Sequence, residues 1–311
     1  MRIRKPGKIN DRLYFFGREE SCIYLLQGQK ESMIISGGMS YLVPDLLDQF
    51  EAWAIDLLQI RKLLILHAHF DHVGVVPFLK ERHPELEIFA SRRAWEILHM
   101  PKAIDTINQF SRTVAKQKGR AEVYASYALD WQPGIEGHTV SEGDRFDLGD
   151  LDVHVYETPG HSSCSISAYV PRLQAIFASD GGGVPYKDTI LTPGNSNFTK
   201  YQQSLEKLKD LDVAYVCADH YGYVAGDEAG DFLQRAVELA KKQRAQLERT
   251  YMRTRDIDLA AQETARAFAE ENPDYLLTPE ISLAVFRQMY RHIAGGVDAR
   301  SNPGSGEPVS R

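Results

Sequence analysis

The six residues HAHFDH, at positions 67 to 72, place three histidines and one aspartate directly after an apolar run. Imidazole and carboxylate groups are ligands for zinc and for other divalent ions of the first transition row. Buried histidine and aspartate side chains are costly unless they have partners. The spacing H-x-H-x-D-H allows His67 and His69 to face one ion while Asp71 and His72 face a second. Gly74 then permits either a turn or a close backbone approach.

Two ions need more ligands than this stretch supplies, and three further candidates occur later in the chain. They are His161 in YETPGHSS, Asp180 in IFASDGGG and His220 in YVCADHYG. Each follows an apolar run, at the point where a predicted strand gives way to a loop. Ligand-binding groups collect at such strand ends in open sheets. The other histidines are interpreted as surface or packing residues: His83, His99, His138, His154 and His292.

The segments that must position these residues alternate between strand and helix patterns. Runs rich in β-branched and aromatic residues predict strands at 12–18, 22–28, 32–38, 61–68, 86–91, 144–150, 151–157, 164–170, 174–180 and 213–219. Helical spacing of apolar residues predicts helices at 44–54, 75–84, 201–211, 231–253, 258–271 and 279–294. We therefore expect an α/β unit over 1–228 with helices inserted at about 92–130, then a helical extension over 229–294 that caps the site. The polar, Gly-, Pro- and Ser-rich tail at 295–311 is expected to be disordered.

The motif order H-x-H-x-D-H, T-P-G-H, S-D-G and D-H-Y-G resembles that of the metallo-β-lactamase-fold hydrolase superfamily. The motifs cover residues 67–220, and the strand order extends the resemblance to about 12–225. It implies an αββα sandwich over residues 1–228, with two divalent metal ions along one edge of its sheets. The superfamily favours zinc, with iron or manganese as alternatives. Matched residue by residue, the resemblance assigns one ion to His67, His69 and His161, the second to Asp71, His72 and His220, and the bridge between them to Asp180.

Two bridged ions lower the pKa of a shared water and so supply a hydroxide nucleophile near neutral pH. Asp71 is placed to orient this hydroxide and to relay its proton to the leaving group. Together with the bridging Asp180 it is predicted to be catalytic. The expected function is a dinuclear metal-dependent hydrolase that cleaves an acyl thioester, ester or lactone. Two alternatives stay open: a mononuclear iron persulfide dioxygenase, and a regulatory or interaction protein that retains the metal site.

Within the superfamily, the pattern is most similar to that of the quinolone-signal-response thioesterases, with glyoxalase II and the acyl-homoserine lactonases as wider relatives. The stretch HAHFDHVGVVPFLKERHPELEIFAS, the SGGMS turn and the two sets of added helices carry this resemblance. It implies thioester or ester hydrolysis in a pocket capped by helices.

The residues at two positions differ from those that are frequent in the superfamily. Ser36 stands where many members carry an aspartate, and Asp219 precedes the last histidine, either as a partner of a ligand or as a surface charge.

The pocket wall is expected to include aromatic residues of the inserted helices and of the loops beside the ligands. Candidates in the inserted segment are Trp95, Met100, Phe110, Tyr124, Tyr127 and Trp131. Tyr221 and Tyr223 follow the last ligand and are candidates to contact the substrate or to donate to its oxyanion. The same aromatic residues also fit a role in helix packing, so the identity of the substrate stays open.

The net charge and the cysteine content limit the classes of partner and the cell compartment that we expect for this protein. The net charge of −7 disfavours nucleic acid and anionic membranes as partners. No window holds the roughly 18 consecutive apolar residues that a membrane span needs. Cys22, Cys164 and Cys217 are far apart in sequence and form no CxxC pair, which suits the cytoplasm. The expected partner is a small-molecule acyl substrate, and the helical C-terminal segment is compatible with a homodimer.

Overall fold

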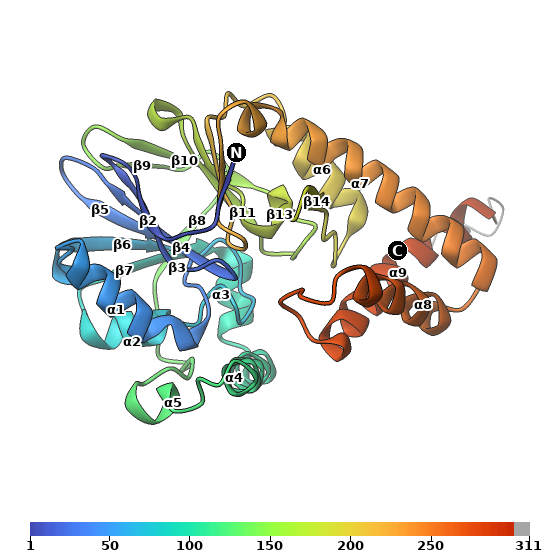
Figure 1. The fold of residues 1–311 in the computed structure, drawn as a ribbon, viewed down its shortest axis with the longest axis horizontal. Coiled ribbons are helices and arrows are strands. Elements are labelled where there is room, and N and C mark those ends of the chain that lie inside the picture. Colours follow the sequence, from blue (N-terminus) through green and yellow to red (C-terminus); the bar gives the residue numbers. More distant parts are fainter. Residues whose placement is uncertain (302–311) are drawn as a thin grey trace, which may run out of the picture.

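Two seven-stranded sheets face each other at the centre of the molecule (Figure 1). The structure is a computed structural model that describes residues 1–301. The first sheet contains, in spatial order, β2 (Gly7–Asn10), β3 (Leu13–Arg18), β4 (Ser21–Gln27), β5 (Ser32–Ile35), β6 (Ile60–Leu64), β7 (Glu87–Ser91) and β8 (His138–Val140). The second contains β1 (Arg2–Ile3), β16 (Tyr223–Ala225), β15 (Tyr215–Cys217), β12 (Ala175–Phe177), β11 (Ile166–Val170), β10 (Asp152–Glu157) and β9 (Arg145–Asp147). A separate hairpin is formed by β13 (Val184–Tyr186) and β14 (Thr189–Leu191).

Helices cover the outer face of each sheet and complete a four-layer sandwich (Figure 1). The first sheet is covered by α1 (Val43–Ala52), α2 (Val76–Arg82), α3 (Arg92–Leu98), α4 (Pro101–Gln117) and α5 (Val123–Ser126). The second sheet is covered by α6 (Phe198–Leu208) and by the first half of α7 (Asp227–Thr254). The layer order helix, sheet, sheet, helix confirms the predicted αββα fold.

The alternation of side chains along each strand divides the apolar residues between an inner and an outer core. In β4, Cys22, Tyr24 and Leu26 point into the core between the two sheets. Ile23 and Leu25 point the other way, toward the helices of the first layer. All five side chains are fully buried. A strand that is buried on both faces therefore has a continuous apolar sequence rather than an alternating one.

The inserted helices form one layer on the first sheet. Ile104, Ile107, Ser111 and Val114 are buried residues of α4, spaced three and four apart along one face of the helix. Pro101 lies in the first turn, where its missing N–H has no helical partner to lose. The helical pattern of residues 92–130 thus has its structural counterpart in α3, α4 and α5.

α7 carries the chain away from the sandwich to a helical pair, α8 (Ile257–Glu271) and α9 (Pro279–Ser301) (Figure 1). Because α9 extends to Ser301, the expectation of disorder from residue 295 is wrong for residues 295–301. Gly295 and Gly296 weaken the helical pattern, but buried Val297 and a 2.9 Å hydrogen bond from Tyr251 Oη to Asp298 extend the helix. The rest of the predicted tail, residues 302–311, lies outside the described residues.

The elements that sequence reasoning missed are short. β1, β2, β8, β13, β14 and β16 have two to four residues each, too few to show a period of two.

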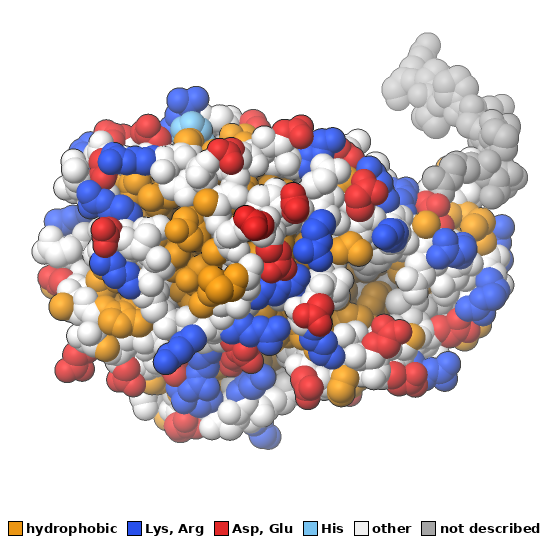
Figure 2. Space-filling model, turned by 45° about the horizontal axis from the view of Figure 1, so that its top comes forward, with side chains coloured by type: hydrophobic (Ala, Val, Ile, Leu, Met, Phe, Trp, Pro, Cys, Tyr) orange, Lys and Arg blue, Asp and Glu red, His pale blue; other side chains and the backbone are white. Residues whose placement is uncertain are grey.

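On the face shown in Figure 2, basic and acidic side chains are interspersed around hydrophobic ones. Among the helices of residues 1–301, none is both long and apolar enough to cross a membrane.

Candidate metal centre

The HAHFDH segment forms the loop between β6 and α2. β6 lies between two parallel neighbours, β5 and β7, so its carboxyl end opens at the edge of the sheet. Gly37 N donates to the His72 carbonyl at 2.8 Å, and Gly74 N donates to the Gly38 carbonyl at 2.7 Å. A Cβ atom at Gly74 would lie 2.1 Å from the backbone nitrogen of Ser40. Of the two roles proposed for Gly74, close backbone approach is therefore the one that applies.

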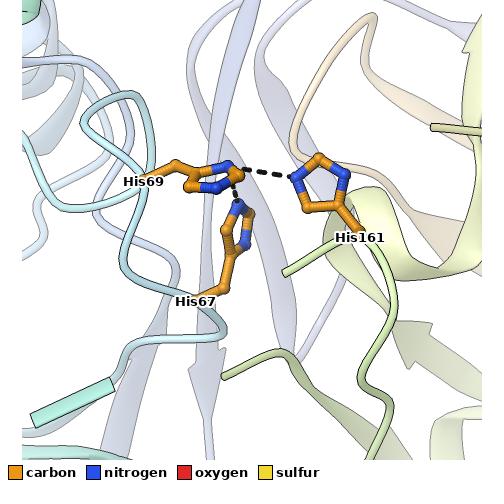
Figure 3. Close-up of side chains that lie close together, drawn as sticks. All are labelled: His67, His69 and His161. Carbon is orange, nitrogen blue, oxygen red and sulfur yellow. Dashed lines mark hydrogen bonds between the residues drawn. The ribbon is translucent and has the colours of Figure 1, made fainter. Parts of the chain in front are cut away.

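Three imidazole rings converge at one edge of the sandwich (Figure 3). His69 Nδ1 lies 3.1 Å from His67 Nε2 and 3.1 Å from His161 Nε2. His161 belongs to the loop that follows β10, so this group joins the two sheets. His67 is fully buried and His161 is 3% exposed. The nitrogen atoms lie within 4.8 Å of one another, which is close enough for one ion to bind all three.

A second group, formed by Asp71, His72 and His220, lies beside the first. Asp71 Oδ2 is 3.6 Å from His72 Nε2 and 3.6 Å from His220 Nε2. Asp180, in the short 3-10 helix Ser179–Gly182 after β12, contacts both groups. Its Oδ2 is 3.3 Å from His161 Nε2 and 3.5 Å from His72 Nε2, and its Oδ1 is 3.6 Å from His220 Nε2. The structure thus brings together all seven residues selected from the sequence, and their role as metal ligands stays a prediction.

The donor set and its spacing fit divalent metal ions. Ligand atoms that are 2.0–2.2 Å from a tetrahedral ion lie about 3.3–3.6 Å from one another. The contacts given above span 3.1 to 3.6 Å. His72 Nε2 and Asp180 Oδ1 are buried and have no hydrogen-bond partner among the described residues. Such atoms are costly to bury alone, and coordination to an ion would satisfy both.

Backbone carbonyls orient two of the imidazole rings. His161 Nδ1 donates to the Pro193 carbonyl at 2.8 Å, and His220 Nδ1 donates to the Glu20 carbonyl at 2.7 Å. A hydrogen bond at the outer nitrogen selects the tautomer in which the inner nitrogen has a free lone pair. Both rings therefore present Nε2 to the centre as a ligand atom.

Asp219 is a buried acid behind the two groups, with 2% of its surface exposed. Its Oδ2 accepts hydrogen bonds from Ser36 Oγ at 3.0 Å, Ser179 Oγ at 2.5 Å and His72 Nδ1 at 2.8 Å. Ser179 Oγ also lies 3.2 Å from His67 Nδ1, so this one carboxylate is connected to a residue of each group. Of the two interpretations left open by the sequence, the structure supports the partner of a ligand.

Burial and mutual repulsion keep the first group of imidazoles neutral. Burial, together with the neighbouring imidazole of His161, lowers the pKa of His69 to about 3. Burial likewise lowers the pKa of His67 well below its ordinary value. For Asp180, burial opposes the charged form, but the imidazoles of His220 and His72 hold its pKa well below the ordinary range. Neutral imidazoles and a charged carboxylate are the forms that bind metal ions.

A cavity of about 350 Å³ opens onto this centre. Asp71, His161, Asp180 and His220 line its inner end. Most of the remaining wall is apolar and comes from the C-terminal helices and the loop between α8 and α9, including Leu239, Leu247, Phe268, Leu276, Val285, Phe286 and Met289. Residues 231–294 therefore shape the cavity.

The three residues predicted to contact the substrate do not line this cavity, and that prediction is corrected. Trp95 is 7% exposed and packs under the inserted helices, with its Nε1 donating to the His138 carbonyl at 2.9 Å. Tyr223 belongs to β16, and strand alternation turns it toward the core between the sheets. Tyr221 stacks near Tyr275, and its Oη accepts a hydrogen bond from the backbone nitrogen of residue 276, so it supports the wall from behind. The wall also lacks the other inserted residues that were considered, Met100, Phe110, Tyr124, Tyr127 and Trp131.

Sequence reasoning missed the loop at residues 192–197. Its Pro193 carbonyl orients His161, and its Asn195 side chain lines the cavity. The pair Pro193-Gly194 indicates a turn in the sequence. No sequence signal places that turn beside a ligand more than thirty residues earlier, because the contact is made only by the fold.

An αββα sandwich with a histidine and aspartate cluster at one edge of its sheets defines a class of metal-dependent hydrolases. Residues 17–220 match the family model described as the metallo-beta-lactamase superfamily, and the chain belongs to this superfamily. Membership confirms the family resemblance drawn from the motifs. At the level of this class it also confirms the prediction of a hydrolase.

The chain is similar to several members of the superfamily. It is 23% identical over 216 residues to the metallo-beta-lactamase fold-containing protein ST1585 of Sulfurisphaera tokodaii, across 67% of this chain and 75% of that protein. It is 27% identical over 198 residues to a hydroxyacylglutathione hydrolase of Hahella chejuensis, across 56% of this chain and 59% of that protein. The solved structure of the metallo-beta-lactamase family protein TTHA1429 of Thermus thermophilus aligns with a TM-score of 0.65 and 18% identity, over 97% of this chain and 98% of that chain. At this identity the structural likeness shows the fold alone.

Proposed function

We propose that this chain is a dinuclear metal-dependent hydrolase that cleaves acyl thioesters, and related esters or lactones. The observation that carries the proposal is Asp180, which contacts residues of both ligand groups at the inner end of a largely apolar cavity. The similarity to a hydroxyacylglutathione hydrolase over 56% of the chain supports thioester hydrolysis. The pattern of the quinolone-signal-response thioesterases supports the same reaction.

Divalent ions at such a centre lower the pKa of a bound water and polarise a carbonyl group. The protein's own residues supply position and proton transfer. Asp71 lines the cavity, and its Oδ2 faces the imidazoles of His72 and His220, where it accepts the proton of the attacking water. The same carboxyl group returns that proton to the leaving group as the acyl bond breaks. The apolar wall holds the acyl chain and excludes bulk water from the reacting carbonyl.

The second ligand group favours two ions over one. A mononuclear iron dioxygenase would leave Asp71, His72 and His220 without a ligand role. These three residues are assembled beside the first group, with Asp71 Oδ2 3.6 Å from both His72 Nε2 and His220 Nε2, and His72 Nε2 has no hydrogen-bond partner among residues 1–301. We therefore favour the hydrolase over the dioxygenase, and we propose a small-molecule acyl compound as its partner. The three free cysteines support the cytoplasm as its compartment.

Metal-stripped protein is expected to be inactive, and reloading with zinc, manganese or iron is expected to restore hydrolysis of thioesters. The reason is that only bound ions lower the pKa of the attacking water enough to supply hydroxide near neutral pH. The measurement is a panel of thioesters, esters and lactones assayed before and after reloading, with the metal content determined for each sample. A content of one iron per chain with oxygen consumption on a persulfide substrate would favour the dioxygenase instead.

Acyl chain length is expected to set the rate within the panel. Each methylene that enters the apolar wall contributes roughly 0.8 kcal/mol, which raises kcat/KM about three- to fourfold until the cavity is full. Val285→Phe narrows the wall on α9 and is expected to shift the optimum toward shorter chains. Leu259→Phe, at a position of α8 that is 45% exposed, is the matched control and should leave the optimum unchanged. An identical optimum in all three proteins would show that the acyl group does not lie in this cavity.

A further inference from the structure

The C-terminal extension brings one tyrosine to the candidate metal centre. Tyr275 lies in the loop between α8 and α9, and it lines the cavity together with Asp71, Asp180 and His220. It lies outside residues 17–220, which match the superfamily model. The family motifs therefore assign it no role.

Aromatic neighbours fix the position of the Tyr275 ring. Its centroid lies 5.0 Å from that of Phe268, 5.3 Å from that of Tyr186 and 6.2 Å from that of Tyr221. The rings of Phe268 and Tyr186 meet it edge-on, which is a favourable arrangement for aromatic pairs. A 3.1 Å hydrogen bond from Leu276 N to Tyr221 Oη holds the same loop against the sandwich. The phenol is thus positioned before a substrate binds.

The hydroxyl group of Tyr275 is available to a ligand. It forms no hydrogen bond within residues 1–301, although the hydroxyl of a tyrosine inside a protein usually has a partner. Tyr186 Oη is also unpaired but is enclosed by the protein, whereas the Tyr275 oxygen is not enclosed in this way. Burial raises the pKa of Tyr275 well above its ordinary value, and the carboxylate of Asp180 raises it further. The phenol therefore keeps its proton near neutral pH and can donate it in a hydrogen bond.

We propose that Tyr275 is a catalytic residue whose hydroxyl donates a hydrogen bond to the carbonyl oxygen of the substrate while the acyl bond is cleaved. This inference rests on the proposed acyl-hydrolase function. Attack of water on the carbonyl carbon forms a C–O bond, moves the π-electron pair onto the carbonyl oxygen and passes one proton to Asp71. The hydrogen bond from Tyr275 strengthens as this oxygen becomes negative, so it stabilises the transition state more than the bound substrate. When the carbonyl group forms again, the C–S bond breaks and Asp71 returns its proton to the sulfur atom.

The charges around Tyr275 favour hydrogen bonding over proton transfer. Asp180 and Asp71 both oppose ionisation of the phenol. A group that holds its proton this tightly is a poor acid for a leaving thiolate, because efficient proton transfer needs a pKa near the working pH. It remains a hydrogen-bond donor, and it adds no negative charge beside the two carboxylates.

The first experiment compares the metal-loaded, full-length wild type with Tyr275→Phe and Tyr186→Phe on the best thioester of the panel. Tyr275→Phe removes the hydroxyl and keeps the ring that packs against Phe268. We expect kcat to fall about 100-fold with little change in KM, which is the signature of a contact made mainly in the transition state. Tyr186→Phe is the matched control, because it removes an unpaired hydroxyl of the same aromatic group that does not line the cavity. The control should keep the wild-type kcat.

The leaving group separates the proposed role from protonation of the departing sulfur. Thioesters of one acid are prepared with an aliphatic thiol and with a more acidic aromatic thiol. Both contain the same carbonyl oxygen, so Tyr275→Phe should lose the same factor in kcat with each. A loss that disappears with the aromatic thiol, whose thiolate can leave without a proton, would overturn the proposal.

A second measurement does not require turnover. Calorimetry gives the affinity of the three metal-loaded proteins for butylphosphonate, whose tetrahedral anionic oxygens resemble those of the transition state. Tyr275→Phe is expected to bind it about tenfold or more weakly than the wild type, and Tyr186→Phe equally well. Wild-type affinity for the phosphonate in Tyr275→Phe, or a wild-type kcat in that variant, overturns the proposal. Failure of the proposed function is a different result, in which the wild type hydrolyses no thioester while the phosphonate comparison still decides the role of Tyr275.

Discussion

Asp180→Ala is expected to lower the metal content of the protein and to remove its hydrolytic activity. The Asp180 carboxylate contacts His161 and His72 through Oδ2, at 3.3 and 3.5 Å, and His220 through Oδ1 at 3.6 Å. Removal of this side chain takes one charged carboxylate away from both ligand groups. We expect the content to fall from about two ions to one or fewer, as in two-metal sites that lose their bridge. We expect kcat/KM to fall by more than about 100-fold, beyond the effect of residues that only support ligands.

The measurement is elemental analysis of the purified variant together with kinetics on the best thioester of the panel. Asp188→Ala is the matched control, because Asp188 is an exposed aspartate in the turn between β13 and β14. The control should keep both the metal content and the rate. A variant at position 180 that binds two ions as tightly as the wild type would show that the carboxylate is not a shared ligand.

Asp219→Ala is expected to weaken metal binding at both groups, although Asp219 contacts neither ion position directly. Its Oδ2 accepts from His72 Nδ1 and from Ser179, whose hydroxyl lies 3.2 Å from His67 Nδ1. Removal of such an orienting partner costs about 10- to 100-fold in metal affinity. It also leaves buried donors unpaired, which destabilises the metal-free fold by about 1–3 kcal/mol for each group. Competition with a chelator measures the affinity, and denaturant unfolding of the metal-free protein measures the stability.

A second variant separates orientation of the ligands from general damage to the fold. Ser36 has a positive φ of 69°, a conformation that aspartate tolerates better than most residues, and its Oγ lies 3.0 Å from Asp219 Oδ2. Ser36→Asp combined with Asp219→Ala therefore places a carboxylate near the same donors from the opposite side. We expect this double variant to recover part of the lost metal affinity. Wild-type affinity in Asp219→Ala alone would contradict the role assigned to this acid.

The ligand cluster could be predicted because its chemistry is local. His67, His69, Asp71 and His72 share one short loop, and the other three ligands each follow an apolar strand. Strands that are buried on both faces have apolar runs regardless of their partners, so β4 could be predicted without any knowledge of the sheet, and β6 from the apolar run that begins at Leu63. The joining of the two sheets at one edge then followed from the family resemblance.

The network behind the ligands could not be predicted in the same way. Ser36, Ser179 and Tyr221 all have positive φ angles next to the centre, although none is a glycine. Such conformations are maintained by surrounding contacts, which a linear pattern does not contain. Asp219 illustrates the same limit, since its sequence neighbours do not reveal that Ser36 and Ser179 converge on it.

The residues that line the cavity were predicted wrongly for a related reason. Aromatic residues near a ligand in sequence, such as Tyr223, point into the core because strand alternation decides their direction. Trp95 packs beneath its own helix layer, where burial of its large ring stabilises the insertion. Residues far along the chain, such as Leu247 and Phe286, reach the centre instead because α7 turns the chain back through α8 and α9.

By itself, the sequence indicated the candidate donor residues of the centre, the strands that end beside them and the class of hydrolase to which the chain belongs. Residue type and local periodicity carry that information, because coordination chemistry and strand burial depend on side chains within a few positions of one another. Tertiary structure alone decided which acid orients the candidate ligands and which side chains of the C-terminal helices line the cavity beside them. Asn195 also acquired its place at the cavity end in this way, since contacts between segments distant in sequence arise only when the layers pack.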